Sequence, residues 1–419
     1  MNEKKESKLI TVLIALLGVT MPFGEQMNIY FPLASLLYTI IGILLFVTAF
    51  TIDVIKNGLR VRIGTKMSIA YWITIVLLSI LLFINLQRIP DALGEQGIIN
   101  YFKQPIFMII GYSVYVVFRK NIKLVYNFIC CFVLGFVIAV PFGQYGEFDG
   151  STRFLGVYSN PNTYAIDCCI MVFFALYLAE NKKHVVMKYA LALLGFVMLL
   201  VTGTRGALLG CVLGLVIYVL KTKRVNTRVM LFAVLPLVCI LLLVYLEASG
   251  NGILSRFISG SVGSAADLRT GIWFAYIKNI SMYFWTGMQE RDFGLIYRKS
   301  PHNTVLGMFV RYGIFVFLPY LIYTVGLLIK SFKRVHSKKE NKSNKVIWCL
   351  FIVVFIAGFF TENFFAKGPY VLLGIVLAID SLRQDELKAA RKARAEIDLN
   401  CSNEETVVST TRGEWHENN

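Results

Sequence analysis

Long apolar runs recur along almost the whole 419-residue chain, and they constrain its fold more than any other feature. Hydrophobic residues make up 57% of the sequence and charged residues only 16%. A helix needs about 20 consecutive apolar residues to cross the hydrocarbon core of a bilayer. The sequence therefore predicts an all-α, polytopic membrane protein with about twelve helices. The predicted spans are 9–23, 29–52, 67–85, 105–118, 122–142, 161–179, 184–202, 203–220, 229–246, 302–329, 346–361 and 369–380.

The basic residues alternate between the connections that join these spans. The net charge is +17, and about 30 of the 42 Lys and Arg residues fall in every second connection or at the termini. Cytoplasmic loops of membrane proteins carry such an excess of positive charge. Both termini are therefore predicted to be cytoplasmic, and no nucleic-acid partner is expected. The lysine-rich start, Met1–Leu9, lacks a small-residue cleavage site and is interpreted as the flank of a retained first helix.

Two hydrophilic segments are predicted to face outward, Gly143–Pro161 and the longer Glu247–Pro301. Residues 247–264 are rich in Gly and Ser and are predicted to be irregular. Residues 265–284 place apolar and aromatic side chains at helical spacing, which predicts an amphipathic helix. This helix either lies at the outer membrane interface or packs on the bundle.

The chain is divided into a transmembrane domain, 1–380, and a cytoplasmic tail, 381–419. The tail begins as a charged helix and is predicted to be disordered over 400–419. The eight cysteines include no C-x-x-C pair, so neither a zinc site nor a disulfide is predicted. The outer segments contain no D-x-D pair and the chain no phosphate-binding P-loop. No metal or cofactor is therefore expected.

Arg205, in TGTRGA, is the sharpest chemical signal. The span after Arg205 is short, so its helix has to begin near Gly203, which places Arg205 at the outer boundary. An arginine at membrane depth is costly and usually faces a partner or a cavity. Its forked donors suit a phosphate group, although an interfacial arginine that reaches for water fits the sequence equally well.

Arg269 and His302 are predicted to lie on the outer side of the membrane, the same side as Arg205. Arg269 is near the start of the amphipathic helix, where an anion would be favoured, or else it is a solvated loop residue. His302 is the only one of four histidines on this side. A neutral imidazole can act as general base on a sugar hydroxyl, and a hydrogen-bonded or helix-capping histidine is the alternative.

Further polar residues surround these three. Asn160 or Ser159 is predicted to cap the helix that begins at Pro161. Arg311 lies nine residues after His302 at membrane depth, and Glu362 is its candidate partner. The predicted substrate contacts are Arg153, Asn160, Asn162, Trp273, Asn303 and Arg311.

Four short motifs follow one another on the outer side. They are GVYSNPNTYA, TGTRGALLG, RTGIW with WTGMQERDFG, and PHNTVLGMFVRYG. In their order and spacing they resemble the O-antigen ligase/polymerase family, which includes lipopolysaccharide O-antigen ligases and polysaccharide polymerases. The resemblance covers roughly 150–315.

The resemblance implies a metal-independent, inverting glycosyltransferase at the outer face of the bacterial cytoplasmic membrane. The implied donor is a glycan on undecaprenyl diphosphate, and the implied acceptor is a hydroxyl of a glycan or glycolipid. Arg205 and Arg269 are implied to contact the diphosphate, and His302 to deprotonate the acceptor. Polymerase and ligase share this donor chemistry; polymerase is favoured.

Two other functions fit part of the sequence. A transporter or a flippase of lipid-linked oligosaccharide would also have about twelve helices, but such proteins favour polar residues near the membrane midplane. A peptidoglycan-type polymerase would use a lipid-linked donor too, and the motifs argue against it.

Overall fold

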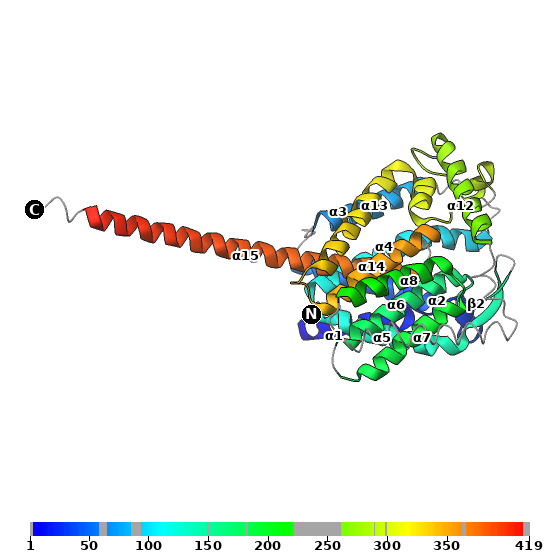
Figure 1. Ribbon diagram of the computed structural model, residues 1–419, viewed down its shortest axis with the longest axis horizontal. Coiled ribbons are helices and arrows are strands. Elements are labelled where there is room, and N and C mark those ends of the chain that lie inside the picture. Colours follow the sequence, from blue (N-terminus) through cyan, green and yellow to red (C-terminus); the bar gives the residue numbers. More distant parts are fainter. Residues whose placement is uncertain are drawn as a thin grey trace, which may run out of the picture.

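The computed structural model describes residues 3–57, 65–84, 94–148, 151–180, 183–221, 261–288, 290–297, 300–362 and 366–413. Over these residues the chain is a helical bundle with one β-hairpin (Figure 1). The helices are α1 (Glu3–Thr20), α2 (Ala34–Asn57), α3 (Lys66–Ile84), α4 (Gly94–Lys120), α5 (Lys123–Ala139), α6 (Pro161–Ala179), α7 (Val185–Val201), α8 (Arg205–Lys221), α12 (Ser261–Lys278), α13 (Thr304–His336), α14 (Lys342–Phe360) and α15 (Lys367–Gly413). Short 3-10 turns occupy Glu25–Ile29, Val140–Phe142, Ile280–Met282 and Glu290–Leu295.

The chain is a polytopic membrane protein. In the described ranges, six helical segments are long and apolar enough to cross a bilayer, and two shorter apolar helices, Lys8–Thr20 and Val185–Val201, accompany them. The predicted span 229–246 lies outside the described residues, so the number of about twelve helices stays a prediction. The six segments are Ala34–Ile55, Lys66–Ile84, Lys123–Phe142, Pro161–Ala179, Thr304–His336 and Lys342–Phe360.

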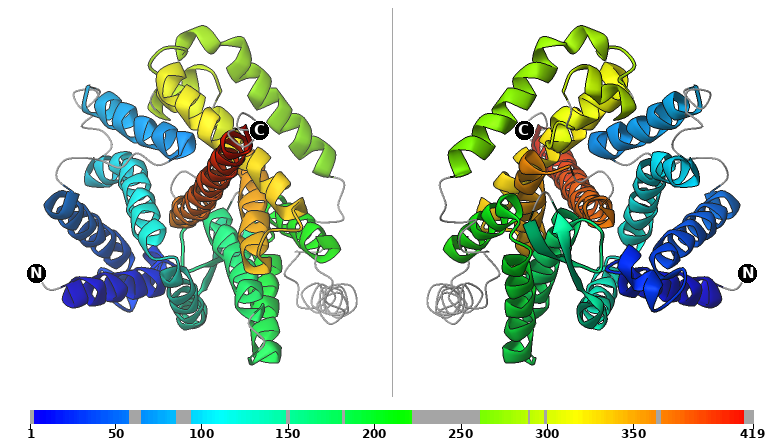
Figure 2. Two further views of the ribbon diagram at one scale, coloured as in Figure 1. Left: turned by 90° about the vertical axis from the view of Figure 1, so that its left-hand side faces the viewer. Right: turned by 90° about the vertical axis from the view of Figure 1, so that its right-hand side faces the viewer.

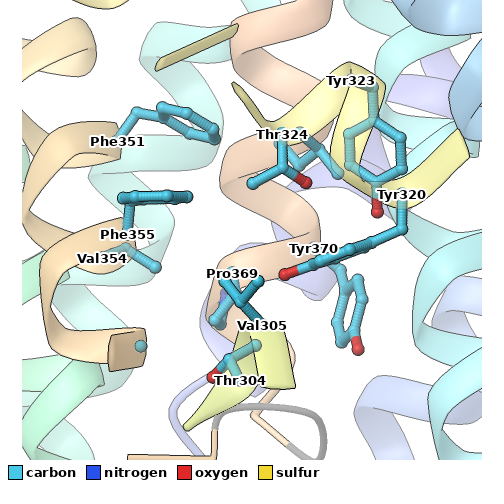
Figure 3. Close-up of a pocket in the computed structure, with 12 residues that line it drawn as sticks. Thr304, Val305, Tyr320, Tyr323, Thr324, Phe351, Val354, Phe355, Pro369 and Tyr370 are labelled. Atoms are coloured by element: carbon cyan, nitrogen blue, oxygen red, sulfur yellow. The ribbon is translucent and has the colours of Figure 1, made fainter. Parts of the chain in front are cut away.

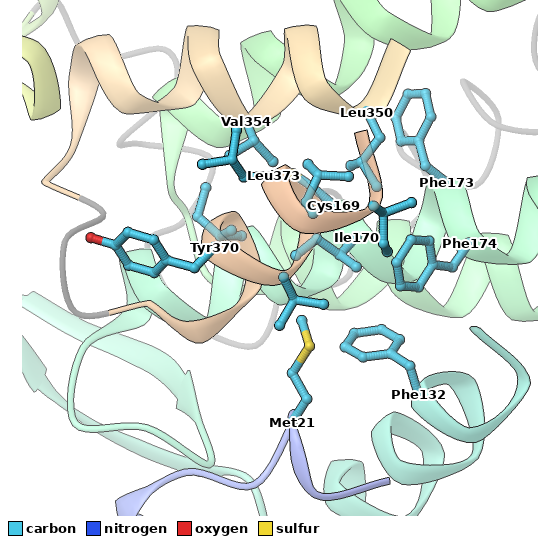
Figure 4. Packing of buried hydrophobic residues seen from close by; sticks show 14 of the residues in the cluster. Met21, Phe132, Cys169, Ile170, Phe173, Phe174, Leu350, Val354, Tyr370 and Leu373 are labelled. Carbon is cyan, nitrogen blue, oxygen red and sulfur yellow. The ribbon is translucent and has the colours of Figure 1, made fainter. Parts of the chain in front are cut away.

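Helix α6 forms the centre of the bundle. It is apolar on all sides, and most of its residues are buried, as expected for a helix that is surrounded by other helices. Figure 4 shows Phe173 and Phe174 of α6 packed with Phe132 of α5, Leu350 of α14 and Leu373 of α15. This packing fixes α6 relative to the helices around it.

The connection between α5 and α6 contains a β-hairpin, which the all-α prediction misses. Strands β1 (Gln144–Phe148) and β2 (Ser151–Gly156) pair antiparallel, with Gly146 opposite Arg153. The hairpin lies at the end of the bundle opposite the N-terminus, and α12 lies toward the same end (Figure 1). We call this end the hairpin end. It is the end that the charge pattern predicts to face outward.

The outer segment is joined to α13 where that helix is interrupted. Gly313, inside α13, has a φ of 69° and non-helical geometry. The Ile314 amide there donates to the Phe284 carbonyl at 2.7 Å, and the Met288 amide donates to the Val310 carbonyl at 2.8 Å. The segment 284–288 therefore satisfies backbone groups that the interruption frees, as it must at membrane depth.

The long outer segment is more helical than predicted. Helix α12 begins at Ser261, so residues 261–264 are helical and not irregular, whereas 247–260 lie outside the described residues. The amphipathic helix predicted at 265–284 is present but ends at Lys278. Its buried side chains Ile272 and Tyr276 join a small apolar cluster with Tyr283, Met288, Phe293 and Val310.

Helix α15 extends far beyond the bundle. It has 47 residues, which corresponds to about 70 Å at 1.5 Å per residue, more than twice the hydrocarbon core. Most of its residues as far as Ser381 are buried, and those from Asp385 to Ala393 are exposed. The prediction of disorder is wrong for 400–413, which is helical. The segment 385–396 is rich in Ala, Glu, Lys and Arg, all strong helix formers, and it continues the helix away from the bundle.

Replacing Gly313 by alanine is expected to lower the thermal unfolding temperature by about 2–5 °C. A positive φ costs an L-residue about 1–2 kcal/mol, and the added Cβ would meet the Trp285 carbonyl and the Gly287 amide. Gly271→Ala is the matched control, since a Cβ at Gly271 has no neighbour within 4 Å. Thermal unfolding of the purified proteins measures both. An unchanged unfolding temperature for Gly313→Ala would contradict this account of the interruption.

Candidate active site

Arg205 opens α8 at the hairpin end. It follows a turn in which Gly203 has a φ of 61°, a conformation that glycine takes without strain. The Arg205 side chain is half-buried, and it makes no hydrogen bond or ion pair with any residue that the structure describes. Its guanidinium and the N-terminus of α8 are therefore available to an anion.

The turn before Arg205 is held by Arg153 from strand β2. Arg153 is 6% exposed; its Nε donates to the Thr202 carbonyl and its Nη2 to Thr204 Oγ1, both at 2.9 Å. Thr204 Oγ1 in turn donates to Asn162 Oδ1 at 3.3 Å. Arg153 and Asn162 thus support the turn that presents Arg205, and direct contact of either with a sugar stays a prediction.

Helix α6 begins as predicted. Asn160 is the N-cap residue, its Oδ1 accepts the Asn162 amide at 2.8 Å, and Pro161 follows at the first helical position. This cap positions Asn162 beside Thr204, so the start of α6 and the start of α8 are linked.

His302 lies in a tightly held connection that enters α13. It has a φ of 50°, an uncommon left-handed conformation for a residue with a side chain. Trp273 Nε1 of α12 donates to the Pro301 carbonyl at 2.8 Å, and the His302 amide donates to Glu362 Oε1 at 3.1 Å. Asn303 is the N-cap of α13, and its Oδ1 accepts the Leu306 amide at 3.0 Å. The capping role belongs to Asn303 and not to His302.

The predicted pair of Arg311 and Glu362 is confirmed. Arg311 Nη2 lies 2.9 Å from Glu362 Oε2, and the two side chains are 8% and 12% exposed. The Arg311 guanidinium carbon also lies 4.9 Å from the centre of the Phe293 ring, which belongs to the outer segment. A charged group at this depth needs such a partner. Contact of Arg311 with substrate stays a prediction.

Arg269 lies one turn before Trp273 on α12, so both project from the same side of that helix. The Trp273 hydrogen bond to Pro301 attaches this side of α12 to the connection that carries His302. The right-hand view of Figure 2 looks onto the hairpin end, with α12 at one edge and the hairpin near the middle. Arg269 is thus carried by a helix that is anchored beside His302.

The end of α14 connects the residues around Arg205 with those around His302. A Cβ at Gly206, next to Arg205, would meet the Phe360 side chain, so the start of α8 packs against the last turn of α14. The next residue, Thr361, accepts a hydrogen bond from Thr304 Oγ1 at 2.8 Å through its carbonyl. Arg205 and His302 therefore flank the same short stretch of chain.

An apolar cavity lies directly below this stretch. It runs between α13, α14 and α15 from Thr304, and Figure 3 shows Tyr320, Thr324, Val354 and Tyr370 around it. Its volume is about 650 Å³, including its open side. Apolar walls at membrane depth suit a hydrocarbon chain.

A second polar cluster was not predicted from the sequence. Tyr158 donates a hydrogen bond of 2.6 Å to Asp167 Oδ2, and the Lys367 ammonium donates to the Phe23 carbonyl at 2.5 Å and lies 5.1 Å from the centre of the Tyr38 ring. Burial, followed by the nearby Asp167 charge, raises the pKa of Tyr158 well above its usual value. Asp167 inside an apolar helix was the signal, because a charge there needs partners. The cluster joins the connection after α1 with α2, α6 and α15.

A family model matches part of the chain. The family model described as O-antigen ligase matches residues 190–321, which include Arg205, Arg269 and His302. The matched segment is about a third of the chain, and over it the chain is similar to the O-antigen ligase family. The comparison with curated proteins found no match. This similarity relates the multi-pass membrane protein to polysaccharide assembly by glycan transfer or polymerisation.

Proposed function

We propose that the protein transfers a glycan from undecaprenyl diphosphate to a sugar hydroxyl at the outer face of the bacterial cytoplasmic membrane. The observation that carries this proposal is Arg205, half-buried at the start of α8 without a partner in the described part of the chain. The hydrogen bond from Arg153 to Thr204 holds the turn before Arg205 in place, so the guanidinium is positioned for an anion from outside the protein. A lipid diphosphate is an anion that reaches this depth.

In the proposed reaction, Arg205 and Arg269 bind the diphosphate while His302 accepts the proton of the acceptor hydroxyl. The acceptor oxygen then forms a bond to the anomeric carbon, with inversion. The bond from that carbon to the diphosphate oxygen breaks, and its electron pair stays on the diphosphate. The two guanidinium groups stabilise this growing negative charge, and the proton leaves His302 to water.

The apolar cavity below Thr304 is proposed to hold part of the prenyl chain. Its lining includes Thr304 and Gly358, close to the end of α14, so a chain held there would leave its diphosphate near Arg205 and His302. A prenyl chain that moves from the bilayer into this cavity exchanges one apolar surrounding for another, so it gains by packing against the cavity walls. Donors with long prenyl chains are therefore expected to bind more tightly than short-chain analogues with the same headgroup.

The test is transfer by the purified protein in lipid nanodiscs that contain a prenyl-diphosphate-linked oligosaccharide and a metal chelator. We expect a new glycosidic bond and release of one prenyl diphosphate for each bond formed. Short-chain donors should show a higher KM with a similar kcat. Absence of bond formation with every donor and acceptor, or movement of intact donor across a proteoliposome membrane, would favour the flippase instead.

The same assay separates polymerase from ligase. A polymerase couples two lipid-linked glycans and needs no other substrate, whereas a ligase forms product only when a lipopolysaccharide core acceptor is present. We propose the polymerase, so product should form from the lipid-linked glycan alone.

A further inference from the structure

We propose that Glu362 is a positioning residue for His302, which it fixes through the backbone; this rests on the proposed function, in which His302 is the base. The carboxylate does not have to touch substrate for this role. It holds the peptide unit from which the imidazole projects.

The peptide bond between Pro301 and His302 is held on both sides. Its carbonyl accepts the Trp273 Nε1 hydrogen at 2.8 Å, and its amide donates to Glu362 Oε1 at 3.1 Å. Trp273 belongs to α12 and Glu362 follows α14, so the two contacts come from elements far apart in the sequence. A planar peptide that is fixed at both its oxygen and its nitrogen cannot rotate.

The direction of the imidazole depends on this fixed plane. His302 takes a φ of 50°, and the next residue, Asn303, is already committed as the N-cap of α13. A histidine without its amide contact could relax toward negative φ, which is preferred by residues with a Cβ. That change would swing the imidazole away from the acceptor. A displacement of about 1 Å of a catalytic group can lower the rate about 100-fold.

Glu362 is itself held in place. Its second oxygen, Oε2, lies 2.9 Å from Arg311 Nη2, and Arg311 is covered by the Phe293 ring at 4.9 Å. One carboxylate oxygen thus binds the backbone of His302 while the other neutralises a buried cation. The two tasks can be separated by mutation.

The test compares two double variants that both lack the buried ion pair. Glu362→Gln with Arg311→Met keeps a side-chain oxygen that can accept the His302 amide, whereas Glu362→Leu with Arg311→Met does not. Both remove the charges together, so neither leaves an unpaired buried ion. In the nanodisc assay we expect kcat of the leucine variant to fall about 100-fold below that of the glutamine variant, with donor KM within about 3-fold.

Equal kcat in the two variants, or a difference confined to KM, would overturn the positioning role of Glu362. The proposed function would still hold in that case, provided that the wild-type protein transfers glycan. Failure of the wild-type protein to transfer glycan would overturn the proposed function instead. If the leucine variant does not fold, Trp273→Phe decides, because it removes the hydrogen bond on the other side of the same peptide. Its kcat should fall with unchanged donor KM, and a normal kcat would contradict the positioning role.

Discussion

Replacing Arg205 by alanine should lower kcat/KM for the lipid-linked donor by about 100- to 1,000-fold. The guanidinium binds the diphosphate in the ground state and more strongly as charge develops on the leaving oxygen. Arg205→Lys should fall between alanine and wild type, because an ammonium keeps the charge but loses the forked donors. The rate of prenyl diphosphate release by purified protein measures all three.

Lys221→Ala is the matched control for Arg205→Ala. Lys221 is exposed at the opposite end of the same helix, so its loss removes one positive charge from α8 without touching the site. The protein should fold normally without Arg205, since this side chain makes no bond to the described residues. Wild-type kcat/KM in Arg205→Ala would remove this residue from the mechanism.

Replacing His302 by alanine should lower kcat by about 100- to 10,000-fold, the usual contribution of a general base. Donor KM should change little, because the imidazole acts on the acceptor and not on the diphosphate. The wild-type rate should also fall at acidic pH, where an imidazole takes up a proton, and this part of the pH profile should vanish in the variant. Steady-state kinetics over a range of pH measures both effects.

His336→Ala provides the control for His302→Ala, since His336 is exposed at the other end of α13. It should keep wild-type kinetics and pH dependence. An unaltered acidic limb in His302→Ala would assign the proton transfer to a different group.

The features of the fold that depend on residues close together in the sequence were predicted correctly. Charged boundaries located the apolar helices, and the Asn160-Pro161 pattern located the start of α6. The interruption of α13 at Gly313 was not predicted, because it depends on a segment near Phe284 that returns to satisfy the backbone. The hairpin was not predicted, because its short strands lie in a polar loop and lack the alternation of apolar and polar residues that indicates a strand.

The same distinction applies to the site. The cost of a buried charge was enough to predict that Arg311 needs Glu362, and the structure confirms that pair. The support of the Arg205 turn by Arg153 was not predictable, since it links residues about fifty positions apart through backbone groups. Contacts of this kind carry no signal in a single sequence.

In the proposed mechanism Arg205, Arg269 and His302 surround one lipid diphosphate, with the arginines on the phosphates and the histidine on the acceptor. Equilibrium binding of undecaprenyl diphosphate to the purified protein, compared among the three alanine variants, tests this most directly. We expect the Kd to be at least about tenfold higher for Arg205→Ala and Arg269→Ala, and unchanged for His302→Ala. Equal affinity in all three variants and the wild type would contradict it.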